Sequence, residues 1–310
     1  MMRDLLSEKL RSYAPENALE QERAVRDLMQ HYVLAGLARA GLFKEAFFHG
    51  GTSLRILFGM SRFSEDLDFM LLRPRRAFRW QPYLDRVAET CAREGIDLEL
   101  RDRSEVDGAV KKAFLKTDSV GKLVLLDLPF SRDQRARVRV KLEIDTNPPA
   151  GSKVESAFIR FPSTVGIAVQ SLASGFATKS HALLCRSYVK GRDFYDLLWY
   201  VDRRVVPDLP LLQNALDQQG PWAGKGVEVT RSWYLDAMAA RVASIDFAAA
   251  RADVMPFVPS REQESVARWS QDLFSYQLRR LAEMWPEPGK GATRPKQGKR
   301  GASRSRPRRR

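Results

Sequence analysis

The strongest constraint on the fold comes from residues 47–69, FFHGGTSLRILFGMSRFSEDLDF, which join a glycine pair to two aspartates. A short apolar run leads into the glycines Gly50 and Gly51, and Thr52–Phe58 is predicted to be a helix that opens directly after them. Leu67–Leu72 is predicted to be a buried strand. The interval between the glycines and this strand allows a helix of about two turns and a return loop. The predicted order is therefore strand, glycine pair, helix, loop and strand.

Carboxylates gather on two of the predicted strands. Asp66 and Asp68 stand at positions i and i+2, so their side chains point to the same face of a strand. Such hard oxygen ligands suit Mg²⁺, and two divalent ions about 4 Å apart can clamp the attacking and leaving oxygens of a phosphoryl transfer. The segment Arg137–Asp145, RVRVKLEID, alternates strictly and puts Glu143 and Asp145 on its polar face. Either can supply a third carboxylate, and the spacing does not choose between them.

The glycine pair offers a cradle for a triphosphate. Gly50 and Gly51 have no Cβ, so the backbone can approach a phosphate closely. Thr52 and Ser53 follow at the predicted helix N-terminus, where free N–H groups and the helix dipole attract an anion. A lone Gly-Gly-Thr is most often a turn with a helix cap, and an isolated Asp-x-Asp is common on surfaces. In this order along one chain, they predict nucleotidyl transfer.

The rest of the chain is predicted to be α+β up to about residue 160 and mostly helical beyond it. Pro148, Pro149 and Gly151 are expected to end the last strand and its sheet. The division predicted is an α+β core at 1–160, a helical domain at 161–285 and a basic tail at 286–310. The other predicted elements are helices at Gln21–Leu42, Phe78–Glu94, Ile167–Tyr188, Asp193–Val201, Leu209–Gln218, Val227–Ala243 and Gln263–Met284, and strands at Ile96–Leu100, Val110–Leu115 and Lys122–Leu128.

Charge and composition narrow the partners and the compartment. The net charge is +14, and residues 289–310 contain many Lys and Arg residues but no acids. Such a tail is expected to be disordered; it either contacts a polyanion such as RNA or acts as a solubilising extension. No apolar stretch is long enough for a membrane span, and the N-terminus lacks the apolar region of a secretory signal. Cys91 and Cys185 stand apart, which predicts neither a zinc site nor a disulfide framework and favours a cytoplasmic protein.

These motifs together resemble the AbiEii/AbiGii toxin family, a branch of the DNA polymerase β-like nucleotidyltransferases. The superfamily pattern is G-[S/G]-[S/T], then D-x-D, then a later h-[D/E]-h, where h is hydrophobic. Features of the branch are Arg62 and Ser64 just before the aspartates, and Lys190–Leu197, KGRDFYDL, which is similar to K-x-R-D-x-x-D. The resemblance runs from about residue 20 to 205. The superfamily pattern is matched by Gly50-Gly51-Thr52, Asp66-Leu67-Asp68 and Leu142-Glu143-Ile144.

The resemblance implies roles for individual residues. Asp66 and Asp68 would be metal ligands, with Glu143 as the first choice for the third carboxylate and Asp145 as its rival. Lys179 would contact the triphosphate, or be an ordinary helix lysine, and Asp196 would orient Lys179 or the acceptor. Arg62, Ser64, Lys190 and Arg192 could bind phosphate. Otherwise Arg62 would brace the loop, Ser64 would be a turn residue, and the other two would belong to a solvated helix start. The nucleotide-binding set expected with these four residues is Gly50, Gly51, Thr52 and Ser53.

The fold implied is a polymerase β-like mixed sheet with flanking helices, followed by a mostly helical C-terminal half. The activity implied is Mg²⁺-dependent nucleotidyl transfer at a two-metal site, with Mn²⁺ as an alternative ion. The protein would be the toxin of a bacterial toxin–antitoxin or phage-defence pair, with a separate antitoxin as partner. Its substrates would be an NTP and an RNA acceptor, for which the branch suggests tRNA 3′ ends. Two other functions stay open: transfer of AMP to a partner protein, and nucleic-acid binding without catalysis.

Overall fold

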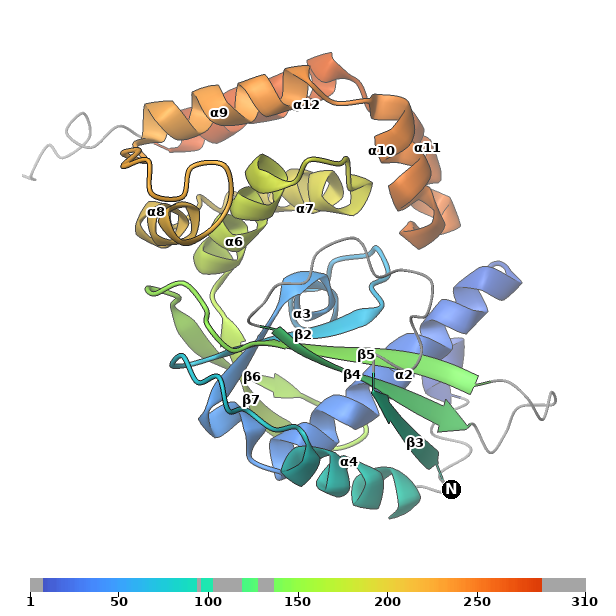
Figure 1. Cartoon of the computed structure of the whole chain (residues 1–310). Coiled ribbons are helices and arrows are strands. Elements are labelled where there is room, and N and C mark those ends of the chain that lie inside the picture. Colours follow the sequence, from blue (N-terminus) through green and yellow to red (C-terminus); the bar gives the residue numbers. More distant parts are fainter. Residues whose placement is uncertain (1–7, 94–95, 103–118, 128–136, 286–310) are drawn as a thin grey trace, which may run out of the picture.

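The fold class predicted from the sequence is confirmed by the computed structural model: a mixed sheet with flanking helices is followed by a mostly helical second half (Figure 1). The structure describes residues 8–93, 96–102, 119–127 and 137–285. The strand predicted at Val110–Leu115 and the tail predicted at 286–310 lie outside these residues.

Seven strands form one sheet in the order β3-β4-β5-β2-β1-β7-β6 in the part of the chain that the structure describes. β2 lies in the middle, antiparallel to β1 and parallel to β5, and β1 is in turn parallel to β7. The two motif-bearing strands, β2 and β5, are therefore neighbours. The strands are β1 (Ala46–His49), β2 (Asp66–Leu71), β3 (Asp97–Asp102), β4 (Ser119–Asp127), β5 (Arg137–Asp145), β6 (Val154–Ile159) and β7 (Val165–Gln170).

The helices form two groups. In the first half, α2 and α4 pack against the sheet, while α3 opens directly from β1 through the glycine pair (Figure 1). In the second half, the helices from α6 to α12 pack mainly on one another. The described helices are α2 (Ala18–Arg39), α3 (Gly50–Phe58), α4 (Gln81–Arg93), α6 (Leu172–Cys185), α7 (Gly191–Asp202), α8 (Leu209–Gln218), α9 (Arg231–Ala243), α10 (Phe247–Val254), α11 (Gln263–Ala267) and α12 (Gln271–Met284), with 3-10 turns at Leu42–Lys44, Met255–Phe257 and Ser260–Glu262.

Two strands occupy a region that was predicted differently. Pro148 and Pro149 follow β5, but the sheet continues with β6 and β7. The helix predicted from Ile167 begins at Leu172 instead, because the preceding residues pair with β1 and β6. Residue 160 falls between these two strands of one sheet, so we propose that the α+β half ends at Gln170.

The second half differs from prediction in three further places. The predicted helix Gln263–Met284 is broken into α11 and α12, because the side chain of Ser270 caps α12 and Trp269 is buried before it. The helix predicted from Val227 starts later, where Thr230 caps α9. The helix α10, capped by Asp246, was not predicted. In each case a local capping residue sets the start of the helix.

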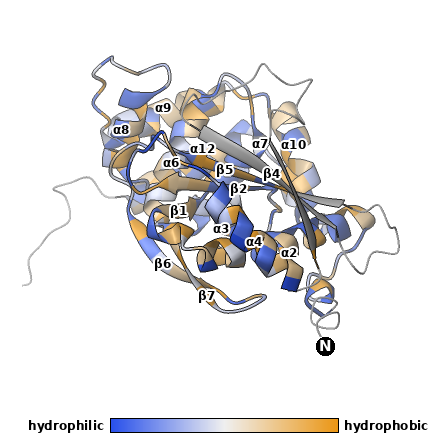
Figure 2. Ribbon diagram, turned by 60° about the horizontal axis from the view of Figure 1, so that its bottom comes forward, coloured by the Kyte–Doolittle hydropathy of each residue, from blue (hydrophilic) through white to orange (hydrophobic). Residues whose placement is uncertain are grey.

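Two hydrophobic cores are joined by α3. The first lies among α2, α4 and the sheet, and the second lies among the helices after β7. Leu54 belongs to the second core, while Ile56 and Leu57 pack against the first. In Figure 2 the helices carry both hydrophobic and hydrophilic residues, as expected of elements with one buried side. None of the described helices is long and apolar enough to cross a bilayer. The helix α3, which begins with the glycine pair, therefore packs against both cores.

Candidate active site

The carboxylates predicted to act together lie on paired strands. β2 and β5 run parallel, with Asp68 paired to Glu143 and Asp66 paired to Lys141. Directly paired residues of neighbouring strands project to the same face of a sheet. Asp145 is paired two residues farther along, to Met70. Its carboxylate accepts the backbone N–H of Asn147 at 3.0 Å in the turn after β5. The register therefore puts Glu143, rather than Asp145, level with Asp68.

Lys141 is part of this group, although the sequence interpretation assigned it no role. Its Nζ lies 3.2 Å from Oε1 of Glu143 and 3.7 Å from Oδ2 of Asp66. The signal that could have found it is its position on the polar face of the alternating strand, two residues before Glu143. The ammonium partly neutralises the carboxylates.

The electrostatic environment of the aspartates is unusual. Burial raises the pKa of Asp66 to about 6, and the charge of Asp68 adds to the shift, whereas Lys141 opposes it. Burial and the charge of Glu143 also raise the pKa of Asp68. Carboxylates that are close together and partly removed from water cost folding free energy in their charged form, and such groups concentrate at functional sites.

A divalent cation fits the chemistry of these donors. Asp66, Asp68 and Glu143 offer only hard oxygen ligands, and a cation between them would relieve their repulsion. They are the residues that would hold Mg²⁺. In the described part of the chain, no three metal-ligating side chains, these three included, stand close enough together to form a preformed site, so the fit to a cation rests on the chemistry of the donors.

The glycine pair lies directly against one of these carboxylates. Gly50 has a φ of +80°, and a Cβ there would lie 2.5 Å from Oδ2 of Asp68. The residue at the N-cap of α3, His49, forms no side-chain capping hydrogen bond. The N–H groups of the first turn of a helix have no partners within the helix, so they can bind an anion there. A predicted phosphate cradle and a predicted metal ligand therefore meet at one place.

Substitution of Gly50 by alanine should impair the site more than the fold. The new Cβ would displace Asp68, and a misplacement of about 1 Å can lower a catalytic rate about 10²-fold. Gly224→Ala is the matched control, because Gly224 also has a positive φ, +69°, but no atom lies within 4 Å of its would-be Cβ. Both variants share a backbone strain of about 1–2 kcal/mol. Transfer rates and urea unfolding of the two proteins check this; equal rates would show that the contact with Asp68 is unimportant.

The hydroxyls predicted to bind nucleotide are used within the protein. The Thr52 hydroxyl donates to the backbone carbonyl of Asp66, and Ser53 Oγ donates to the carbonyl of Gly50 at 2.8 Å. Both residues are buried. Ser64 lies beside Gly51, with its Oγ 3.0 Å from the position of a Cβ there. Any contact of Thr52 and Ser53 with phosphate would thus come from their backbone N–H groups.

A buried ion network joins the loop before β2 to α6 and α7. The guanidinium of Arg62 contacts Oδ1 of Asp196 through Nε at 2.7 Å and Nη2 at 2.6 Å. The ammonium of Lys179 lies 2.8 Å from Oδ2 of Asp196 and 2.8 Å from Oδ1 of Asp193. Asp193 also pairs with Arg186. Asp196 thus contacts Lys179 directly, and Arg62 braces the loop with its guanidinium engaged by Asp196 and by the carbonyl of Phe63.

The opposite charges of this network stabilise one another. Burial opposes ionisation of Lys179, but Asp193 and Asp196 outweigh it and raise the pKa of the ammonium. Burial likewise opposes ionisation of Asp193, yet Lys179 and Arg186 hold the pKa of that carboxyl well below its usual range. Both groups are therefore charged at neutral pH. Arg186 and Asp193 received no separate role from the sequence, although Asp193 stands inside the K-x-R-D-x-x-D motif.

The two remaining predicted phosphate ligands differ in their surroundings. Lys190 precedes α7, and its charge acts on both Asp66 and Asp68. Its ammonium makes no hydrogen bond or ion pair with a residue in the described ranges, and burial lowers its pKa. The guanidinium of Arg192, in contrast, stacks 4.1 Å from the ring centroid of Phe257 and lies 3.6 Å from Oε2 of Glu65. Lys190 is therefore the better placed of the two to meet a phosphate.

Comparison with known proteins gives the family. Residues 32–273 match the family model described as nucleotidyl transferase AbiEii toxin, Type IV TA system. The chain belongs to the AbiEii family. The match extends well beyond residue 205, where the recognisable motifs end, and reaches the start of α12. Nucleotidyl transfer is the activity class of this AbiEii protein, and a toxin–antitoxin system is its setting.

Two solved structures are similar to this chain. A candidate nucleotidyltransferase from H. pylori is 16% identical, with 84% of this AbiEii chain and 98% of that chain covered at a TM-score of 0.46. JHP933 from Helicobacter pylori is 18% identical, with 83% of this chain and 90% of that chain covered at a TM-score of 0.45. No curated protein matches the chain.

Proposed function

We propose that the protein is a toxin that acts in the cytoplasm and transfers a nucleoside monophosphate from an NTP to an RNA acceptor, the 3′ end of tRNA being the acceptor class. The observation that carries the proposal is the contact between Gly50 and Asp68, which joins an anion cradle to a carboxylate cluster. A cognate antitoxin is the expected protein partner. The net charge of +14 supports a polyanionic acceptor.

The residues divide the work of such a reaction. The first-turn N–H groups of α3 and the ammonium of Lys190 bind the phosphates. Asp66, Asp68 and Glu143 would hold Mg²⁺, which when bound would neutralise phosphate charge and stabilise the transition state. The acceptor hydroxyl oxygen forms a bond to the α-phosphorus, the bond from that phosphorus to the bridging oxygen breaks, and pyrophosphate leaves. The hydroxyl proton passes to water.

Lys179 and Asp196 act from the buried network. The ammonium of Lys179 has three N–H donors. One donates to Oδ1 of Asp193, and the ammonium also forms an ion pair with Oδ2 of Asp196. A remaining N–H can reach a triphosphate oxygen, since 15% of the side chain is exposed. Asp196 then serves as the positioning residue for Lys179 and, through Arg62, for the loop that leads into the metal ligands.

The choice between the two candidates for the third carboxylate has a direct test. Glu143→Gln should lower the transfer rate by about 10²-fold or more, because it removes a charge level with Asp68. Asp145→Asn should retain most of the activity, since an asparagine oxygen can still accept the N–H of Asn147. Initial rates at saturating Mg²⁺ check both variants. The reverse order of effects would assign the third carboxylate to Asp145.

Labelled NTPs distinguish this function from its alternatives. The purified protein is incubated with each NTP, labelled at the α-phosphate, together with tRNA or with total bacterial protein. Label on RNA supports the proposal, whereas label on protein shows a protein-modifying enzyme. Tight RNA binding without any transfer shows a binding protein of the same fold.

A further inference from the structure

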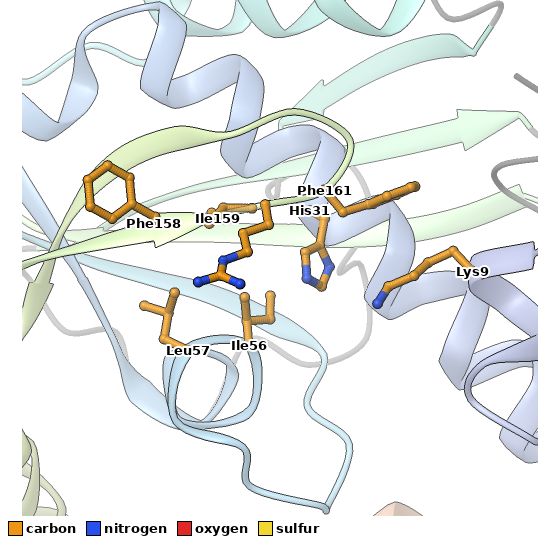
Figure 3. A pocket seen from close by; sticks show the side chains of 8 residues that line it. Lys9, His31, Ile56, Leu57, Phe158, Ile159 and Phe161 are labelled. Carbon is orange, nitrogen blue, oxygen red and sulfur yellow. The ribbon is translucent and has the colours of Figure 1, made fainter.

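A pocket opens at the end of α3 that lies far from the glycine pair. It is a cavity of about 370 Å³, and Figure 3 shows residues of α2, α3 and β6 around it. Its lining includes Ile56 and Leu57 from the last turns of α3, whereas the carboxylate cluster lies beside the first turn. Six residues of helix separate Gly50 from Ile56, which corresponds to about 9 Å along the helix axis. The pocket is therefore distinct from the candidate active site.

The polar groups of this pocket are all nitrogen-bearing. Lys9, His31 and Arg160 line it, and none of the lining residues in the described part of the chain is a carboxylate. Nδ1 of His31 lies 2.8 Å from the carbonyl oxygen of Asp27. A carbonyl only accepts, so Nδ1 carries the hydrogen, and Nε2 of the neutral ring is an acceptor. Burial keeps the ring neutral by lowering its pKa. The pocket thus offers two cations for an anion and one acceptor for a hydroxyl or amine.

The apolar groups of the pocket are aromatic as well as aliphatic. Phe158 on β6 is 65% exposed, more than any other large hydrophobic residue in the described part of the chain. Phe161 packs edge-on against His31, with ring centroids 6.2 Å apart. An exposed ring beside cationic side chains is the arrangement that single-stranded nucleic-acid sites use, because a base stacks on the ring while the cations meet phosphate.

We propose that this pocket binds one nucleotide unit, with its phosphate at Lys9 and Arg160, a ribose hydroxyl donating to Nε2 of His31, and its base against Phe158. A free nucleotide and a unit of the acceptor RNA away from its reacting end share this chemistry. The RNA source is the one that rests on the proposed function. In that case the pocket anchors the acceptor while its 3′ end lies at the carboxylates. An acidic peptide would use the two cations but has no need of Nε2 or of an exposed ring.

Equilibrium binding of a short fluorescein-labelled oligoribonucleotide, followed by anisotropy with the full-length protein, tests the pocket. Lys9→Glu/Arg160→Glu should raise the Kd at least about tenfold through lost phosphate contacts. Phe158→Ala should raise it about fivefold or more through lost stacking. The control is Arg73→Glu/Lys225→Glu, which makes the same charge change at two exposed positions that do not line the pocket and should alter the Kd far less. Circular dichroism and thermal unfolding confirm that all three variants are folded.

The competitors identify the source of the nucleotide. Failure of excess AMP to displace the RNA supports an RNA site. Displacement by AMP that depends on Lys9 and Arg160 supports the nucleotide pocket but overturns its assignment to RNA. Equal Kd values for the pocket variants and the control, or displacement by a glutamate-rich peptide alone, would overturn the proposal. Transfer to tRNA by the wild type is measured in parallel. Its absence, with pocket binding intact, would refute the proposed function alone; normal transfer without pocket-dependent binding would refute the pocket alone.

Discussion

Asp68→Asn should lower the rate of nucleotidyl transfer by about 10³-fold while leaving the protein at least as stable as the wild type. The carboxylate is half-buried beside Glu143. Burial and the charge of Glu143 raise its pKa, so its charge is unfavourable to folding at neutral pH. Asparagine has the same shape and no charge. The substitution therefore removes a metal ligand and relieves a repulsion at the same time. Initial rates with Mg²⁺ and urea unfolding at pH 7 measure the two effects separately.

The combination of the two results is what distinguishes a functional carboxylate from a structural one. Asp66→Asn should behave in the same way, because Asp66 is held on the same face of β2 with its pKa raised to about 6. Loss of activity accompanied by marked destabilisation would show that the charge supports the fold. Full activity with normal stability would remove Asp68 from the reaction.

Asp196→Ala should have the largest effect on stability, about 3–5 kcal/mol. Asp196 is fully buried and contacts both Arg62 and Lys179. Its removal leaves the buried guanidinium of Arg62 without a carboxylate, whereas the partly exposed ammonium of Lys179 still has Asp193. Urea unfolding at neutral pH measures the loss. The transfer rate should fall as well, because the loop that carries Arg62 leads directly into β2.

A matched control lies on the same helix. Asp202, at the end of α7, pairs with Arg280 at 2.8 Å, but its side chain is 59% exposed. Asp202→Ala should therefore change stability little, since exposed ion pairs contribute little. Equal stability losses at the two positions would contradict the view that burial makes the Asp196 network important.

The centre of the sheet was predictable because its signals are local. The glycine pair, the aspartates on β2 and the strict alternation of β5 each depend on residues close together in the chain, and the structure has all three. The part of β7 from Ile167 onward is predicted from the sequence to begin a helix, because Val165–Gln170, VGIAVQ, is a short apolar run that suits either structure. Pairing with distant β1 decides it, and no local pattern contains that information.

In the site, too, features that depend on local sequence were predictable, and features that depend on distant contacts were not. The residues predicted to hold metal come together on paired strands, because alternation determines which side chains share a face. The brace role of Arg62 depends on Asp196, which lies 134 positions later in the chain. Lys190 and Arg192 are two residues apart in one motif, but their surroundings differ. In the second half of the chain, the ring of Phe257 stacks on the guanidinium of Arg192, and the carboxylate of Asp253 accepts the backbone N–H of Arg192. Such tertiary contacts separate a predicted phosphate ligand from a structural residue.

Mass spectrometry of a tRNA substrate tests the central claim most directly. Purified wild-type protein is incubated with tRNA, the four NTPs and Mg²⁺, and the RNA is then digested and its 3′ fragment weighed. We expect the fragment to gain the mass of one or more nucleotides with the wild type, and to stay unchanged with Asp68→Asn or with a chelator in place of Mg²⁺. An unchanged fragment with the wild type, or an equal gain with Asp68→Asn, would contradict the account.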